Sequence, residues 1–335
     1  MVNGIYTLAN DVVYDQLVAL LNSIEANVSP NIPVCIIPYD SKLDKIRAEV
    51  ATRDNVTLFE DADAIAYWEN FADQAWNAHQ NAQKVWQERG LAVNYRLARH
   101  RRLCCFDGPF DKFIYFDADT LAMKSLDEVY QKLDEYDWVT NDFQYKSNLH
   151  YVFESPEETL IKIFNPEKLK SHIFCSGWFA SKKNVFNRER IENLLGKLKA
   201  GEANVMSLRC IDQPLLNYMV LRSDIPYYNF AYHNPEETTG SHWSSKFEVV
   251  NQVFYDKGQP LTYLHYMSIS SSKFARLCAG EDVDIPYQDV FLHYRFLKSP
   301  EQHPQQLVRP NWIVRAQRAT NRFINKKIRN VKHKF

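Results

Sequence analysis

The chain has 335 residues, of which 45% are hydrophobic and 24% are charged, as is typical of a globular protein. Its 40 basic residues nearly cancel its 41 acidic residues, which argues against a nucleic-acid-binding protein. No stretch approaches the roughly 20 apolar residues of a membrane span, and the six cysteines form no CxxC pair that would indicate a zinc site or disulfide framework. Because the first residues lack a signal-peptide pattern, we expect a cytoplasmic protein.

The first sixty residues alternate between strand and helix patterns. The expected elements are strands at 2–9, 32–37 and 56–59, and helices at 13–24 and 41–52. This alternation predicts an α/β fold, with a parallel sheet that carries helices on its faces. Ligands bind such sheets at the carboxyl ends of the strands, so we expect Leu8, Ala9 and Asn10 at the mouth of a site.

The remaining elements are less regular. Residues 61–106 are expected to be helical, with a break at Gly90. The expected elements after them are strands at 113–116 and 174–179 and helices at 184–199 and 211–221. Residues 226–300 are expected to alternate between short strands and loops.

Two aspartates follow an apolar run in the middle of the chain. Phe113 to Phe116 predicts a strand, and Asp117 and Asp119 follow it with one small residue between them. Alternation along a strand places both carboxylates on the same side. Because neighbouring carboxylates repel each other, Mn²⁺ or Mg²⁺ would neutralise them and bridge to a diphosphate. The alternative is a solvated acidic turn.

A histidine ends another apolar run late in the chain. His265 follows Leu261 to Leu264, and imidazole is a common ligand of Mn²⁺. The next groups are those that bind phosphate, namely the hydroxyls of Ser268, Ser270, Ser271 and Ser272 and the ammonium of Lys273. The alternatives are a packed structural histidine and a flexible serine loop.

Two further charged motifs are candidates for the same site. Asp212 and Gln213 begin a predicted helix, where the carboxylate serves equally as a first-turn anion or as part of a site. Arg96, Arg99 and Arg102 recur every three residues on a predicted helix. They could reach a diphosphate, and a solvated basic face explains them equally well.

Together these motifs resemble the GT-A glycosyltransferases of family 8, the glycogenin and galactosyltransferase group, over residues 2–275. The matching segments are Leu8-Ala9-Asn10-Asp11 with Tyr14, Asn22-Ser23-Ile24, Arg99 or Arg102, Ile114-Tyr115-Phe116-Asp117-Ala118-Asp119, Asp142, Asp212-Gln213, and His265-Tyr266 with Lys273. The resemblance implies a Rossmann-like mixed sheet flanked by helices, with the GT-A domain at 1–300. Cys175-Ser176-Gly177 departs from the family's Asn-x-Gly, and Lys273 lies eight residues after the histidine instead of six.

The resemblance also implies a reaction, in which a hexose moves from a UDP-sugar or GDP-sugar to a hydroxyl of a glycan or lipid-linked acceptor, with retention. The implied metal ligands for Mn²⁺ or Mg²⁺ are Asp117, Asp119 and His265. The implied donor-binding residues are Leu8, Asn10, Tyr14, Arg99, Arg102, Ala118 and Lys273. The residues implied near the reacting carbon are Asp142, Asp212 and Gln213.

Two other functions fit part of the pattern. A haloacid-dehalogenase-like phosphatase also has Asp-x-Asp after an apolar strand, but it needs Thr or Val where this chain has Leu121. A catalytically idle GT-A scaffold that binds a sugar nucleotide or a partner protein is the second alternative. The departure at Cys175 favours such a scaffold, and the intact Asp117, Asp119 and His265 argue against it.

The C-terminal segment 301–335 has a different composition. From Gln306 onward it contains nine Lys or Arg residues and no Asp or Glu, with Trp312, Ile313 and Phe323 among them. This composition predicts a basic amphipathic tail that adsorbs to an anionic membrane surface, which makes the protein peripheral on the cytoplasmic face. The alternative is a solubilising tail.

Overall fold

The structure is a computed structural model that describes residues 2–312 and 314. Its main sheet has seven strands in the order β3-β2-β1-β4-β7-β6-β8. The strands are β1 (Asn3–Ala9), β2 (Val34–Pro38), β3 (Val56–Leu58), β4 (Lys112–Asp117), β6 (Trp138–Thr140), β7 (Trp178–Lys182) and β8 (Tyr227–Asn229). Only β7 runs antiparallel to its neighbours in this sheet. The predicted α/β fold with a mixed sheet is therefore confirmed.

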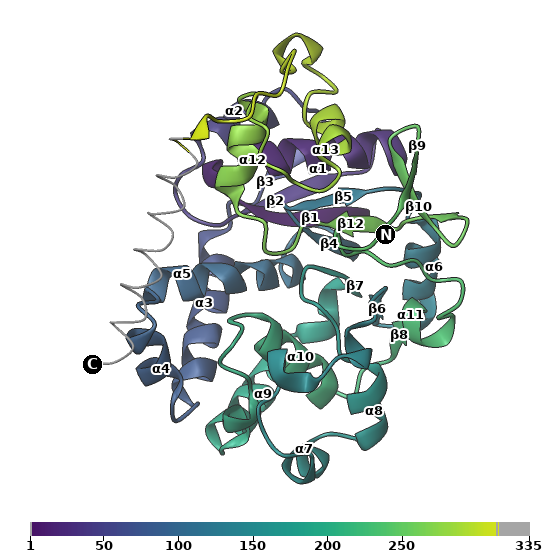
Figure 1. Cartoon of the computed structure of the whole chain (residues 1–335). Coiled ribbons are helices and arrows are strands. Elements are labelled where there is room, and N and C mark those ends of the chain that lie inside the picture. The colour runs from purple at the N-terminus through teal and green to yellow at the C-terminus, as the bar shows by residue number, and fades with distance from the viewer. Residues whose placement is uncertain (1, 313, 315–335) are drawn as a thin grey trace.

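Helices cover both faces of the sheet (Figure 1). They are α1 (Tyr14–Asn27), α2 (Asp44–Val50), α3 (Ala62–Asn77), α4 (Ala82–Glu88), α5 (Val93–His100), α6 (Asp127–Glu135), α7 (Glu157–Ile163), α8 (Pro166–Ser171), α9 (Arg188–Lys199) and α10 (Gln213–Arg222). Side chains of β1 alternate between the faces. Ile5 and Ala9 join a core with α1 and α6, and Tyr6 and Leu8 join a core with α3, α9 and α10.

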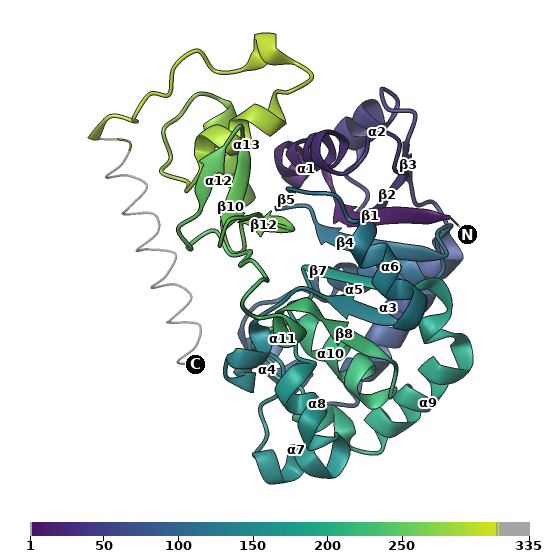
Figure 2. The ribbon, with the colours of Figure 1, turned by 90° about the vertical axis from the view of Figure 1, so that its right-hand side faces the viewer.

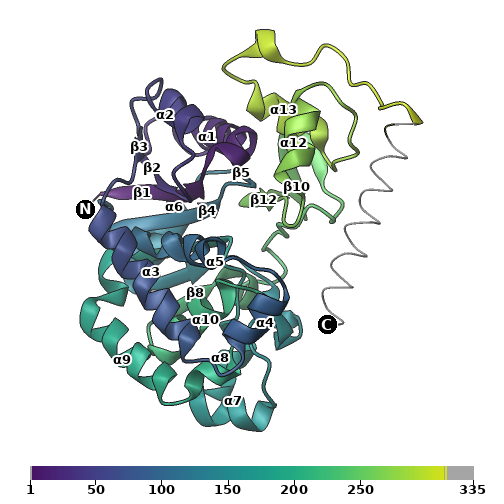
Figure 3. The same ribbon diagram turned by 90° about the vertical axis from the view of Figure 1, so that its left-hand side faces the viewer.

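The C-terminal part forms a further layer on the outer side of α1 (Figures 2 and 3). Its elements are β9 (Glu248–Val250), β10 (Val253–Asp256), β11 (Gln259–Pro260), β12 (Tyr263–His265), α12 (Ser271–Cys278) and α13 (Gln288–Arg295). The short helix α11 (Phe230–His233) lies instead beside β6 and β8 of the main sheet. The side chain of Asn22 on α1 donates a 2.7 Å hydrogen bond to the carbonyl of Tyr294 on α13. Strand β12 pairs with β5 (Thr120–Ala122), which directly follows β4. This pairing brings the late histidine to the middle aspartates.

Residues 61–106 form α3, α4, α5 and a 3-10 segment, and the predicted break at Gly90 lies between α4 and α5. A further break, between α3 and α4, was not predicted, and two other predictions need correction. The strand expected at 174–179 begins only at Trp178, because the backbone N–H groups of Cys175 and Ser176 bond to the side chains of Asp142 and Gln213. Residues 226–300 also contain α11, α12 and α13.

Among the described residues, none of the helices is both long and apolar enough to cross a membrane. Residues 313 and 315–335 of the predicted basic tail lie outside the described part of the chain.

Candidate active site

Three potential metal ligands meet at the end of β4. The strand ends at Asp117, and Ala118 and Asp119 form a tight turn before β5, so Asp119 is not on the strand as predicted. Strand β12 pairs with β5 and places His265 opposite Thr120. One ligand atom from each of Asp117, Asp119 and His265 lies within 4.8 Å of the others. Two carboxylates and an imidazole are a suitable ligand set for Mn²⁺ and related divalent cations.

A glycine leaves room for this arrangement. The carbonyl of Gly177 accepts a 2.8 Å hydrogen bond from the backbone N–H of Asp117. A Cβ atom on Gly177 would lie 2.4 Å from Cε1 of His265 and 3.0 Å from Oδ2 of Asp117. Any larger residue at this position would therefore displace the histidine.

The buried guanidinium of Arg102 contacts two carboxylates, those of Asp117 and Asp212. Nη2 of Arg102 lies 3.2 Å from Oδ1 of Asp117 and 3.0 Å from Oδ2 of Asp212, and Nη1 donates to the carbonyl of Ser176 at 2.6 Å. Only 4% of Arg102 is exposed. Arg99 lies 3.7 Å from the other oxygen of Asp212, and its side chain is 41% exposed. The solvated basic face considered from the sequence therefore does not describe Arg102.

The ionisation of the acidic groups follows from these neighbours. Burial raises the pKa of Asp117 even though Arg102 is adjacent. Burial also acts to raise the pKa of Asp119, but the nearby His265 outweighs it and lowers the pKa. In the same way, Arg102 and Arg99 outweigh the burial of Asp212 and lower its pKa to about 2. Burial raises the pKa of Asp142 to about 6, although two backbone N–H groups bond to this carboxylate and His265 also acts to lower its pKa.

A cavity of about 460 Å³ opens beside these ligands, a volume suited to a small-molecule ligand. It is lined by Leu8, Ala9, Asn10, Val12, Val13, Gln16, Tyr39, Tyr95, Arg99, Arg102, Asp117, Ala118, Asp119, Ile269 and Ser271. Leu8, Ala9 and Asn10, which the sequence places at the carboxyl end of the first strand, are among these lining residues. The carboxamide of Asn10 donates to Asp40 at 2.9 Å and accepts from the N–H of Val12 at 3.1 Å, which fixes the turn after β1.

Other predicted residues lie outside the lining of this cavity. Tyr14 donates its hydroxyl to Glu49 at 2.7 Å, and Lys273 is half-buried in the first turn of α12. Asp142 and Gln213 accept hydrogen bonds from the backbone N–H groups of Cys175 and Ser176, just before Gly177. Asp212 makes no side-chain cap to α10 and is joined to the metal ligands through Arg102.

Two aromatic residues of the cavity were not among the predicted site residues. Tyr39 directly follows β2, so the strand-end rule applied to Leu8 would also have selected it. Tyr95 lies one helical turn before Arg99 and accepts a hydrogen bond from it at 2.5 Å. The rings of Tyr39 and Tyr95 are 6.4 Å apart, edge to face, and form an aromatic wall of the cavity.

Comparison with solved structures identifies the fold. A galactosyltransferase, LgtC, in complex with donor and acceptor sugar analogues has a TM-score of 0.53 and 15% identity, over 88% of this chain and 95% of that chain. An active-site mutant of LgtC has a TM-score of 0.52 and 14% identity, over 87% and 94% of the two chains. The bifunctional glycosyltransferase WbbM has a TM-score of 0.51 and 17% identity, over 91% of this chain and about half (52%) of that protein. These similarities show that the chain has the GT-A fold.

Sequence comparisons add no relative, since no family model and no curated protein match the chain.

Gly177→Ala tests whether His265 and Asp117 need the space that the missing side chain of Gly177 leaves. We expect its Cβ to displace His265 and weaken Mn²⁺ binding at least tenfold, measured by calorimetric titration, with the fold retained. Gly196→Ala on α9 is the matched control, because a Cβ there meets nothing within 4 Å and should slightly stabilise the helix. Equal Mn²⁺ affinity for the two variants would contradict the expectation.

Asp212→Asn tests the pairing with Arg102. A carboxyl whose pKa falls from 3.8 to about 2 on folding contributes stability above its unfolded pKa and loses it as the pH drops toward 2. Each unit of pKa corresponds to about 1.4 kcal/mol, so at pH 7 the free energy of unfolding of the wild type should exceed that of Asp212→Asn by roughly 2.5 kcal/mol. Urea unfolding between pH 7 and pH 3 should show this gap narrowing in acid. Asp54→Asn, at an exposed loop position, should show no such gap.

Proposed function

We propose that this protein is a metal-dependent glycosyltransferase that moves a hexose from a nucleotide-diphosphate sugar, in the first instance a UDP-sugar, to an acceptor hydroxyl. The observation that carries the proposal is the position of Asp117, Asp119 and His265 beside a cavity that also contains Arg99 and two tyrosines. This cavity lies at the carboxyl ends of β1 and β4 in a GT-A fold, where such sheets bind ligands.

The nucleotide would occupy the aromatic end of the cavity. Tyr39 and Tyr95 offer ring surfaces against which a base can stack, and Leu8 adds an apolar contact. Asn10 is held in the turn after β1 by hydrogen bonds with Asp40 and with the N–H of Val12. The ribose would lie next to this turn.

The diphosphate would lie between the metal ligands and Arg99. A bound Mn²⁺ or Mg²⁺ would supply Lewis acidity and neutralise charge on the leaving diphosphate. Arg102 is already occupied by Asp117 and Asp212, so Arg99 is the guanidinium available to the ligand. Its Nε atom has no hydrogen-bond partner among the described residues. Ser271 brings the N-terminus of α12 to the cavity, which favours an anion, and Lys273 follows in the same turn.

The hexose would then face Asp142 and Gln213. Asp142 is held by the backbone N–H groups of Cys175 and Gln144, and Gln213 accepts from Ser176. Asp212 is paired with Arg102, so we assign it the positioning of the arginines instead of attack on the sugar. Following the resemblance to family 8, we propose a retaining reaction in which Gln213 lies beside the anomeric carbon. The proposed acceptor is a hydroxyl of a glycan or a lipid-linked glycan.

A thermal-shift and hydrolysis assay tests this proposal. We expect UDP or GDP to raise the melting temperature only when Mn²⁺ is present, because a ligand at 100 times its Kd adds about 2.7 kcal/mol to the free energy of unfolding. Asp119→Ala should lose this stabilisation, and Asp63→Ala, an exposed change on α3, should keep it.

The same assay separates the alternatives. Release of nucleotide from a UDP-sugar or GDP-sugar supports the transferase, whereas nucleotide binding without turnover of any donor indicates an idle scaffold. If neither nucleotide stabilises the protein with Mn²⁺, the proposed function is wrong.

We also propose that the basic tail attaches the protein to the cytoplasmic face of an anionic membrane, near a lipid-linked acceptor. The support is the sequence after Gln306, with its nine cations, and the 71% exposure of Trp312. Full-length protein should float with phosphatidylserine liposomes, and a truncation after Gln305 should remain in the pellet fraction. Equal flotation of the two proteins would rule out this role.

A further inference from the structure

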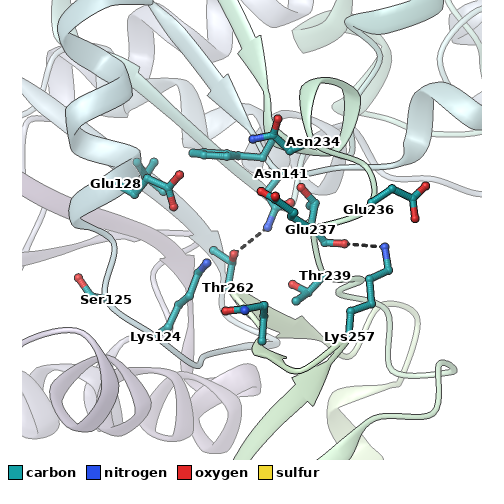
Figure 4. Close-up of a pocket in the computed structure, with 14 residues that line it drawn as sticks. Lys124, Ser125, Glu128, Asn141, Asn234, Glu236, Glu237, Thr239, Lys257 and Thr262 are labelled. Atoms are coloured by element: carbon teal, nitrogen blue, oxygen red, sulfur yellow. Dashed lines mark hydrogen bonds between the residues drawn. The ribbon is translucent and has the colours of Figure 1, made fainter.

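A second cavity of about 380 Å³ shares no lining residue with the first. Figure 4 shows how its walls come together. One wall is Lys124 to Val129, after β5 and in α6, and the opposite wall is the loop after α11. The end of β6 and the β10–β11 hairpin close the remaining sides.

The floor of this second cavity is polar and buried. Asn141, Thr239 and Thr262 are each 5% exposed, and Thr238 is 8% exposed. The amide of Asn141 donates a 2.7 Å hydrogen bond to Oγ1 of Thr262, drawn as a dashed line in Figure 4, and its Oδ1 has no partner among the described residues. If the amide is turned over, its nitrogen is left without a partner instead. A buried amide atom of this kind is uncommon and marks a place where a ligand can hydrogen-bond.

Charges of both signs surround the rim. Glu128, Glu236 and Glu237 oppose Lys124 and Lys257, so the rim carries three carboxylates and two ammonium groups. Lys257 donates to the carbonyls of Pro235 and Thr238, which holds the loop after α11 in place. The mixed charge does not suit a diphosphate, in contrast to the cavity that contains Arg99 and Arg102.

The floor and rim together suit a sugar. Hydroxyl and amide groups both donate and accept hydrogen bonds, as the hydroxyls of a sugar do. The rim carboxylates add acceptors, the lysines add donors, and the ring of Phe230 offers an apolar face to the C–H groups of a pyranose. A metal cation would lack a cluster of acidic ligands there, because the floor is uncharged.

We propose that this cavity is a saccharide subsite that holds a sugar unit of the acceptor, apart from the unit that receives the hexose. The proposal rests on the proposed function. Its location supports it, since Asn141 directly precedes Asp142, and Thr262 directly precedes β12, which ends at the ligand His265. An acceptor held there would lie alongside the transfer site without competing for the nucleotide cavity.

Saturation-transfer NMR on the full chain tests this inference, with lactose, maltose and cellobiose as probes. We expect at least one disaccharide to bind, and Thr239→Val to weaken that binding tenfold or more by removing a floor hydroxyl. Thr7→Val is the matched control, because Thr7 is equally buried and its hydroxyl has no partner among the described residues. Binding should be unchanged in this control.

Two further measurements make the test decisive. Glu128→Gln changes only an exposed rim group, so it remains informative if Thr239→Val does not fold, and it should weaken binding at least threefold. In Asp119→Ala the disaccharide should still bind while Mn²⁺-dependent binding of UDP is lost, so failure of the donor site is distinguishable from failure of the subsite. Absence of binding by all three disaccharides, or equal binding by wild type and both subsite variants, would overturn the inference.

Discussion

The buried guanidinium of Arg102 is the constraint on which the rest of the site depends. A charge removed from water is tolerated only when it is paired and hydrogen-bonded, and Arg102 meets this requirement with groups from three distant segments. Asp117 ends β4, Asp212 precedes α10, and the carbonyl of Ser176 precedes β7. Each of these segments must reach its place for the charge to be satisfied, so one interaction aligns the metal-binding turn with the region around Gln213. It also leaves Arg99 as the cation that is open to the cavity.

Much of the fold and half of the site could be predicted because they follow from local rules. Short apolar runs separated by amphipathic helices predicted the first three strands and their parallel arrangement. The rule that ligands bind at the carboxyl ends of such strands selected Leu8 and Asn10, which line the cavity. The two aspartates were informative because of their place after an apolar strand, and the structure brings His265 to them through the pairing of β12 with β5. The sequence could not show that Asp119 belongs to a turn, although the carboxylates meet in either case.

The rest depended on contacts between residues far apart in the chain. Helical spacing could not tell Arg99 from Arg102, because the distinction lies in Asp117 and Asp212, which come from other segments. The segment before Gly177 has the apolar character of a strand, but side chains of Asp142 and Gln213 take the hydrogen bonds that a neighbouring strand would make. The second cavity had no sequence signal, since threonine and asparagine residues like those of its floor are ordinary residues individually.

The pairing of β5 with β12 makes the candidate metal site depend on the folding of the whole described chain, because His265 reaches the two aspartates only through this pairing. Its two strands lie about 140 residues apart in sequence, and contacts that close such long loops form late because the lost chain entropy is repaid only at the end. A partly folded chain can already hold Asp117 and Asp119 at the edge of the main sheet, yet it lacks His265 until the C-terminal layer has docked on α1. On the proposed function, incompletely folded molecules would therefore lack the full set of metal ligands and would leave the nucleotide-sugar donor unconsumed.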